Sequence, residues 1–105
     1  RDLFGMTPPD DARGCLQDIH WSMGGLGYFA TYTLGNLNAA QLFATAKKQR
    51  KIAAGLEKCD YAPLLGWLRE NVHAHGASLT PQEIMRQATG RPTDAKWHIA
   101  HLRER

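Results

Sequence analysis

The fold of this chain is decided by residues 14–32, which read Gly14-Cys15-Leu16-Gln17-Asp18-Ile19-His20-Trp21-Ser22-Met23-Gly24-Gly25-Leu26-Gly27-Tyr28-Phe29-Ala30-Thr31-Tyr32. An amide, a carboxylate, an imidazole and an indole stand within five positions, and three glycines and two tyrosines follow. Polar side chains that can point at a ligand, aromatic rings, and glycines that let the backbone come close are together typical of the wall of a ligand-binding site. The same residues also fit a helix end, with Gly24 or Gly25 as its cap and the polar side chains bonded locally.

Helix signals account for most of the chain, and no window alternates apolar and polar residues as a half-buried strand does. Prolines followed by aspartates at residues 7–11 predict a short helix over about 10–18. Apolar residues at three- and four-residue steps predict a long helix over about 28–50. A second strong helix is predicted over 60–76. Its inward stripe is Tyr61, Leu64, Leu65, Leu68 and Val72, with Trp67 on a flank.

The last third of the chain carries two further helix signals. Thr80 and Glu83 form a capping-box pattern around Pro81, which predicts a helix over 81–88 that the Gly90-Arg91-Pro92 turn ends. Thr93 or Asp94 is expected to cap a final helix. Its inward-facing residues are predicted to be Trp97, Ile99, Ala100 and Leu102.

Composition favours a single globular unit over 1–105, with 43% hydrophobic and 22% charged residues and a net charge of +3. No stretch approaches the ~18 apolar residues of a membrane span, and two isolated cysteines indicate reduced thiols, so a soluble cytoplasmic protein is expected. The chain starts without Met or a signal-like pattern, which favours a cut-out from a longer protein. The uncharged run over 26–46 also predicts missing protein around it, because a small bundle could not surround such a helix.

Histidine spacing argues against a metal site in this chain. His73 and His75 would lie on different faces of a helix. His98 and His101 could face one ion, but no third ligand has suitable spacing.

Three stretches resemble the carboxypeptidase Taq family of metallocarboxypeptidases. They are Gly14-x-x-Gln17-Asp18-x-His20-Trp21 with the Gly27-Tyr28-Phe29-x-Thr31-Tyr32-x-Leu34-Gly35-Asn36-Leu37 run behind it, the Asp60-to-His73 segment, and the tail from Ala88 to Leu102-Arg103. Ala30 stands where the family pattern has Pro. The resemblance implies an all-α fold, the helical C-terminal portion of a larger gluzincin-type metallopeptidase, with 1–105 as one segment.

The resemblance also implies a mechanism. The parent enzyme would use zinc or another divalent metal to remove C-terminal residues from peptides that have a free C-terminus. The family's His-Glu-x-x-His motif is absent here, so this chain is expected to bind no metal and, when isolated, to be inactive without the remainder of the parent. His20 and Tyr28 are the implied catalytic residues, as oxyanion donors. The implied substrate-binding residues are Gln17, Asp18, Trp21 and Tyr32, with Asp18 orienting His20. No arginine stands out for the substrate carboxylate.

Two other classes of function remain open on the residues alone. Residues 80–105 read as helix, Gly-Arg-Pro turn and helix, which has the outline of a nucleic-acid-binding helix-turn-helix. The final helix carries few side chains suited to base edges, so binding to nucleic acid is not expected. A helical interaction module, with homodimerisation possible, fits the uncharged helix but leaves the Gln17-to-Trp21 group without a purpose.

Overall fold

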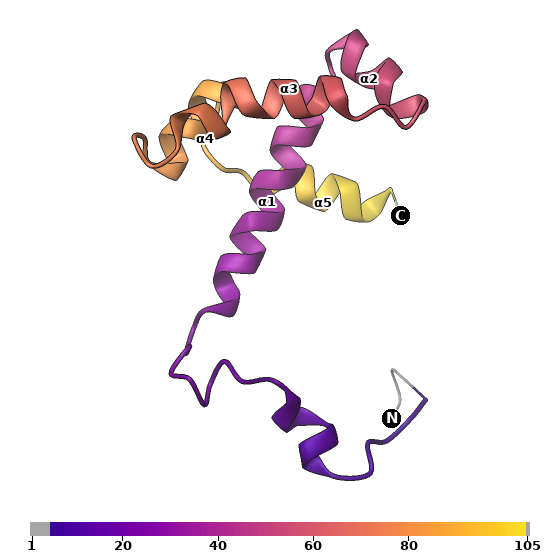
Figure 1. Cartoon of the computed structure of the whole chain (residues 1–105), viewed down its shortest axis with the longest axis vertical. Helices are drawn as coiled ribbons and strands as arrows, with labels where there is room; N and C mark the ends of the chain where they lie inside the picture. The colour runs from indigo at the N-terminus through magenta and orange to yellow at the C-terminus, as the bar shows by residue number, and fades with distance from the viewer. Residues whose placement is uncertain (1–4, 105) are drawn as a thin grey trace. The chain divides into compact units, whose positions relative to one another are not determined.

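The computed structural model describes residues 5–104, and every regular element in that range is helical (Figure 1). The chain divides into two compact units, residues 1–32 and 33–105, and each is described by itself. The all-α prediction is confirmed for the described range, and no helix within it is long and apolar enough to cross a bilayer. The elements are η1 (Asp11–Arg13), η2 (Cys15–Gln17), α1 (Phe29–Ala46), α2 (Arg50–Glu57), α3 (Ala62–Asn71), η3 (His73–His75), α4 (Pro81–Thr89) and α5 (Lys96–Arg103).

The first unit is built from turns and short 3₁₀ helices. The single helix predicted over 10–18 is wrong, because Gly14 adopts φ −120° and ψ −116° and separates η1 from η2. Asp10 does cap the start, since its carboxylate accepts a hydrogen bond from the Arg13 backbone N–H at 2.8 Å. No residue of the described range 5–32 is buried. Local hydrogen bonds therefore shape this unit without a hydrophobic core of its own.

The second unit has a small core where α1, α2 and α3 meet. Ala46, Ile52 and Trp67 are its buried residues, with exposed fractions of 0%, 2% and 9%. Half-buried side chains surround them: Leu42, Leu56, Leu64, Leu68 and Ala88. The predicted stripe of α3 therefore needs correction: Trp67 belongs to the buried face, and Tyr61 and Leu65 are exposed.

The long helix is shorter than predicted. α1 ends at Ala46, and α2, which was not predicted, starts at Arg50. A tight turn separates them, with the backbone N–H of Gln49 donating to the carbonyl of Ala46 at 3.0 Å. Because Ala46 and Ile52 are both buried, packing on either side of the turn fixes its position. The basic run over 47–51 thus occupies the turn after α1 and the first residues of α2.

The starts of α3, α4 and α5 lie close to their predicted positions, although α3 ends at Asn71, before the predicted Gly76. Thr80 and Glu83 form the predicted capping box, and Gly90 ends α4 in the left-handed conformation at φ 78°. The N-cap of α5 is Ala95, not the predicted Thr93 or Asp94; the Asp94 carboxylate lies just before it and accepts from the Lys96 backbone N–H at 2.9 Å. The inward face predicted for α5 is wrong at three of its four positions, since Ile99, Ala100 and Leu102 are exposed.

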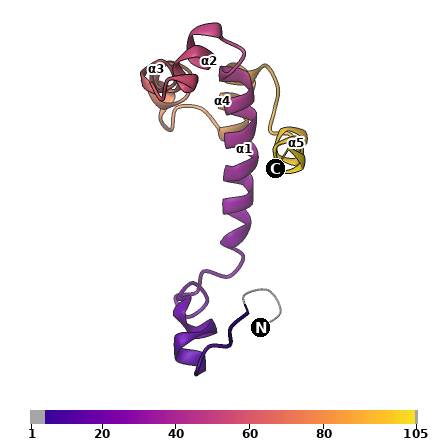
Figure 2. The ribbon, with the colours of Figure 1, turned by 90° about the vertical axis from the view of Figure 1, so that its right-hand side faces the viewer.

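Gln41 ties α1 to the connector between α4 and α5. Its side chain is fully buried, and the amide nitrogen donates to the Thr89 hydroxyl at 2.8 Å and to the backbone carbonyls of Arg91 and Pro92. The amide oxygen accepts from the Asp94 backbone N–H at 2.9 Å. Within residues 33–104, α3 and α5 lie on opposite sides of α1 (Figure 2). The connector held by Gln41 leads the chain into α5.

Candidate active-site segment

Asp18 and His20 form the polar centre of the first unit. One carboxylate oxygen of Asp18 accepts the backbone N–H of His20 at 2.9 Å and lies 3.0 Å from the imidazole Nδ1. The other carboxylate oxygen lies 3.2 Å from the same nitrogen. The two-residue separation makes this possible, because an aspartate side chain readily bonds the backbone two positions on. One carboxylate therefore fixes both the local backbone and the Nδ1 side of the ring.

The glycine-rich turn after His20 returns the chain toward the imidazole. The Gly25 backbone N–H donates to the His20 carbonyl at 2.7 Å, and the Tyr28 N–H donates to the Gly25 carbonyl at 3.2 Å. A Cβ atom at Gly25 would lie only 2.9 Å from the His20 carbonyl oxygen. A side chain at this position would force the two backbone segments apart. The turn is thus the local reason why the start of α1 meets His20.

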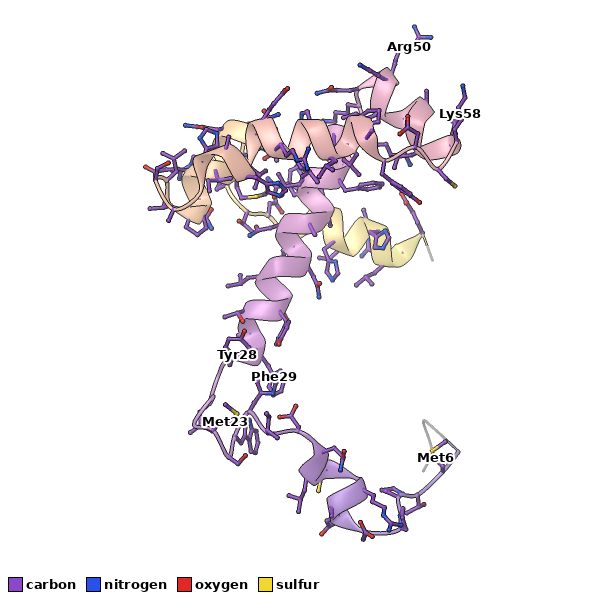
Figure 3. The ribbon with its side chains drawn as sticks, in the orientation of Figure 1. Met6, Met23, Tyr28, Phe29, Arg50 and Lys58 are labelled. Atoms are coloured by element: carbon purple, nitrogen blue, oxygen red, sulfur yellow. The ribbon has the colours of Figure 1, made fainter. Side chains whose placement is uncertain are left out.

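Three aromatic rings gather around the imidazole, and we call His20, Tyr28, Phe29 and Tyr32 the aromatic cluster. The Tyr28 ring stacks on His20 with centroids 5.5 Å apart and planes 20° apart. Phe29 lies closer, at 4.7 Å and 48°, and Tyr32 presents its edge at 6.5 Å and 82°. Tyr28 and Phe29 stand side by side at the beginning of α1 (Figure 3). Each of the three rings is about half exposed, so the cluster is open to a ligand.

Two titratable groups of this segment are shifted. The hydrogen bond from the His20 backbone, with the imidazole contact adding to it, lowers the pKa of Asp18. Negative charge on Tyr28 raises the pKa of Tyr32, and desolvation and the neighbouring Tyr28 hydroxyl add to the effect. At neutral pH, Asp18 is therefore ionised and Tyr32 keeps its proton.

The predicted site residues are not all brought together. Asp18, His20, Tyr28 and Tyr32 meet, as described above. The Gln17 amide instead donates to the Ala12 carbonyl and so closes the turn around η2. Trp21 is 71% exposed, and among the described residues its indole makes no ring contact with the aromatic cluster.

Phe29 is the member of the cluster that the sequence reasoning missed as a site residue. Its signal was the density of aromatic residues immediately after the glycine turn, where three stand within five positions over 28–32. Aromatic rings that follow a tight turn tend to meet what precedes it, because the turn brings both flanks together.

No group of three His, Cys, Asp or Glu side chains gathers as a metal site within residues 5–104. The second unit does hold a pocket of about 1070 Å³, which includes Leu42, Leu64, Trp97 and His98 among its lining residues. None of the six predicted site residues lines that pocket. The chemistry of the candidate site therefore rests on the aromatic cluster and Asp18, which supply hydrogen-bond donors and one buttressing carboxylate.

Comparison with known proteins gives a consistent set of relatives. The chain is 38% identical over 108 residues to thermostable carboxypeptidase 1 of Pyrococcus furiosus and 40% identical over 108 residues to carboxypeptidase 1 of Bacillus subtilis. These alignments cover 98% and 97% of this chain but 21% of each relative. The chain thus spans about a fifth of the length of the curated relatives it matches.

Solved structures agree with these relatives. A crystal structure of BsuCP aligns with a TM-score of 0.81 at 39% identity, covering 98% of this chain and 21% of that one. Metallocarboxypeptidase 1 of Trypanosoma cruzi aligns with a TM-score of 0.80 at 37% identity, covering 96% and 22%. The family model described as carboxypeptidase Taq (M32) metallopeptidase matches residues 1–105. This chain therefore belongs to the carboxypeptidase Taq (M32) metallopeptidase family.

Proposed function

We propose that this chain is the C-terminal part of a zinc-dependent carboxypeptidase that removes C-terminal residues from peptides. In that parent enzyme it supplies part of the substrate wall and the donors that stabilise the oxyanion. The observation that supports this role best is the meeting of Asp18, His20 and Tyr28, with the Asp18 carboxylate 3.0 Å from Nδ1 and the Tyr28 ring stacked on the imidazole. A buttressed imidazole beside a phenol is a donor pair suited to a developing negative charge.

The Asp18 contact decides how His20 can act. A carboxylate at Nδ1 favours a proton on that nitrogen, so the neutral ring presents a lone pair at Nε2. Only the imidazolium form then has a hydrogen at Nε2 to donate. When water adds to the scissile carbonyl carbon and negative charge grows on its oxygen, protonated His20 donates from Nε2 and Tyr28 donates from its hydroxyl. Asp18 stabilises the positive charge that this role requires.

Gln17, Trp21 and Tyr32 complete the proposed wall. Tyr32 packs edge-on to Tyr28 with centroids 5.4 Å apart, which extends the half-exposed aromatic surface along the first turn of α1. The exposed indole of Trp21 offers an apolar face to a peptide side chain. Gln17 contributes by closing the preceding turn, which holds the backbone that carries Asp18.

Residues 5–104 do not fit a zinc site, because no three suitable ligands gather among them. We therefore assign the metal ligands, and the glutamate that accepts the proton from water, to the rest of the parent. Membership of a metallopeptidase family supports a divalent metal there.

Exposed apolar side chains support a role for the rest of the parent as a covering partner. Leu16, Trp21, Met23 and Leu26 are each exposed by two thirds or more, and none of the described residues 5–32 is buried. In α1 only Gln41 and Ala46 are buried. Large apolar surfaces of this kind are usually covered by protein.

We propose that the isolated chain is inactive and that the complete enzyme is cytoplasmic. Homodimer formation stays a prediction.

The test uses a full-length enzyme that carries this sequence. Its release of the last amino acid is measured from a peptide with a free C-terminus and from the same peptide with an amidated C-terminus. The proposal expects cleavage of the first peptide only, and a fall in that activity of roughly 10²- to 10³-fold in His20→Gln. His73→Gln, in an exposed histidine outside the cluster, is the matched control and should retain activity. No release by the unmodified enzyme, or full activity of His20→Gln, would contradict the proposal.

A further inference from the structure

The His20 ring is held at one edge by a carboxylate, but that contact does not set its plane. Asp18 touches the imidazole only at Nδ1, with distances of 3.0 Å and 3.2 Å to its two oxygens. The torsion that turns a histidine ring about its Cβ–Cγ bond has broad minima, so a contact at one atom allows the ring to swing. The direction of Nε2, on the far side of the ring, depends on that swing. Other groups must fix it.

Phe29 is the ring nearest to His20 in the aromatic cluster. Its centroid lies 4.7 Å from that of the imidazole, against 5.5 Å for Tyr28 and 6.5 Å for Tyr32. The two rings are tilted by 48°, an arrangement that restricts rotation of the imidazole toward Phe29. Phe29 is itself supported by Tyr32, with centroids 6.1 Å apart. The benzyl side chain has no polar atom, so its effect on His20 is steric and dispersive.

Packing in a hydrophobic core does not account for the position of the Phe29 ring. Its side chain is 45% exposed, and it lies in a unit whose described residues include no buried side chain. The first turn of α1 and the glycine turn before it bring this ring against the imidazole.

We propose that Phe29 is a positioning residue that fixes the plane of the His20 imidazole and thereby aims Nε2. The proposal rests on the oxyanion role proposed for His20. Asp18 keeps a proton on Nδ1 and holds that edge of the ring. Tyr28 stacks on the imidazole and carries its own hydroxyl. Phe29 limits rotation of the imidazole about its Cβ–Cγ bond. Without the Phe29 ring, Nε2 points correctly for only part of the time, so the transition state loses stabilisation while ground-state binding of the peptide changes little.

The kinetic experiment uses the full-length enzyme with three variants. Phe29→Leu keeps an apolar side chain but removes the ring, and we expect kcat to fall by roughly 10- to 100-fold with little change in KM. Phe29→Tyr keeps the ring and should retain most of the kcat of the unmodified enzyme. The matched control is Phe43→Leu, which removes a ring of nearly equal exposure, 44%, from a residue of α1 outside the aromatic cluster. It should leave kcat close to that of the unmodified enzyme.

A double-mutant cycle separates a role through His20 from a direct one. If Phe29 acts by aiming His20, Phe29→Leu should cost little further activity in an enzyme that already carries His20→Ala. Equal losses in both backgrounds would overturn the proposal. Unchanged kcat in His20→Ala alone would instead contradict the oxyanion role of His20.

A spectroscopic measurement tests the contact between Phe29 and His20 on which the positioning depends, independently of the kinetics. Histidines are labelled with ¹³C at the ring carbon between the two nitrogens, and the His20 signal is assigned from its disappearance in His20→Gln. Loss of a neighbouring aromatic ring should shift that signal and change its width in Phe29→Leu, but not in Phe43→Leu. An identical His20 signal in Phe29→Leu would overturn the proposal.

Discussion

The side-chain amide of Gln41 donates to the hydroxyl of Thr89 at 2.8 Å, across 48 positions of the sequence. The Thr89 hydroxyl in turn lies 2.7 Å from the Met85 carbonyl and donates to it within α4. Next to this pair, Thr93 donates to the Asn38 side chain at 2.7 Å, so a second bond joins the connector after α4 to α1. Buried polar groups that are fully paired in this way select one packing of two elements, because any other leaves them unsatisfied.

We predict that Gln41→Leu destabilises the protein by about 3 kcal/mol. Leucine fills most of the space but leaves the Asp94 backbone N–H and the connector carbonyls without their buried partner. The thermal unfolding midpoint of the full-length enzyme measures the loss. Gln87→Leu, which changes an exposed glutamine of α4, is the control and should have little effect. Equal midpoints for the two variants would contradict the assigned role of Gln41.

The capping box of α4 predicts a pH-dependent contribution to stability. The hydrogen bond from the Thr80 hydroxyl, with that from its backbone N–H, lowers the pKa of Glu83 below its ordinary value of 4.5. This stabilisation is complete above the ordinary value and is lost as the pH falls through the lower pKa of the folded chain. Unfolding midpoints of the unmodified enzyme and of Glu83→Gln should therefore differ at neutral pH and converge on acidification. A constant difference at all pH values would speak against an ionic contribution.

Tyr28→Phe tests the second proposed donor. Removal of the hydroxyl should lower kcat by roughly 10²- to 10³-fold and change KM far less, because the bond strengthens only as the oxyanion forms. Steady-state kinetics on a peptide with a free C-terminus provide the measurement. Tyr61→Phe removes a hydroxyl from an exposed tyrosine outside the aromatic cluster and should be silent. An unchanged kcat in Tyr28→Phe would remove Tyr28 from the mechanism.

Asp18→Asn tests the charge state proposed for His20. The amide can still accept a hydrogen bond from Nδ1 but no longer stabilises the imidazolium. Since donation from Nε2 needs the protonated ring, kcat should fall in this variant. Asp11→Asn removes the same charge from the same unit and should leave kcat unchanged. Full activity of Asp18→Asn would contradict a role for the Asp18 charge.

Local signals allowed the sequence to predict α4 well. Thr80, Pro81, Glu83 and Gly90 each act on backbone groups within one helical turn, so their effect does not depend on the rest of the fold. The boundary between α1 and α2 could not be found in the same way. Residues 47–49 contain no glycine or proline, and the turn there depends on the burial of Ala46 and Ile52 in a shared core.

In the candidate site, too, contacts between near neighbours in the sequence could be predicted, and contacts that depend on the fold could not. The Asp18–His20 pair is two residues apart, and its geometry follows from the short reach of aspartate. Phe29 was missed because its contact with His20 exists only after the glycine turn has closed. The role of Gln41 could not be predicted from the sequence at all. Its partners are 48 to 53 positions away, and nothing in a single glutamine indicates that it will be buried.

The Gln41 side chain behaves like one detached peptide unit. It carries an amide N–H and a carbonyl, and the connector pairs with both as it would with a neighbouring strand. Pairing of this kind has a register, because the Pro92 carbonyl and the Asp94 N–H must face the amide together. The spacing between Thr89 and Asp94 is therefore fixed. Deletion of one residue from this connector should therefore leave one side of the Gln41 amide without its partner.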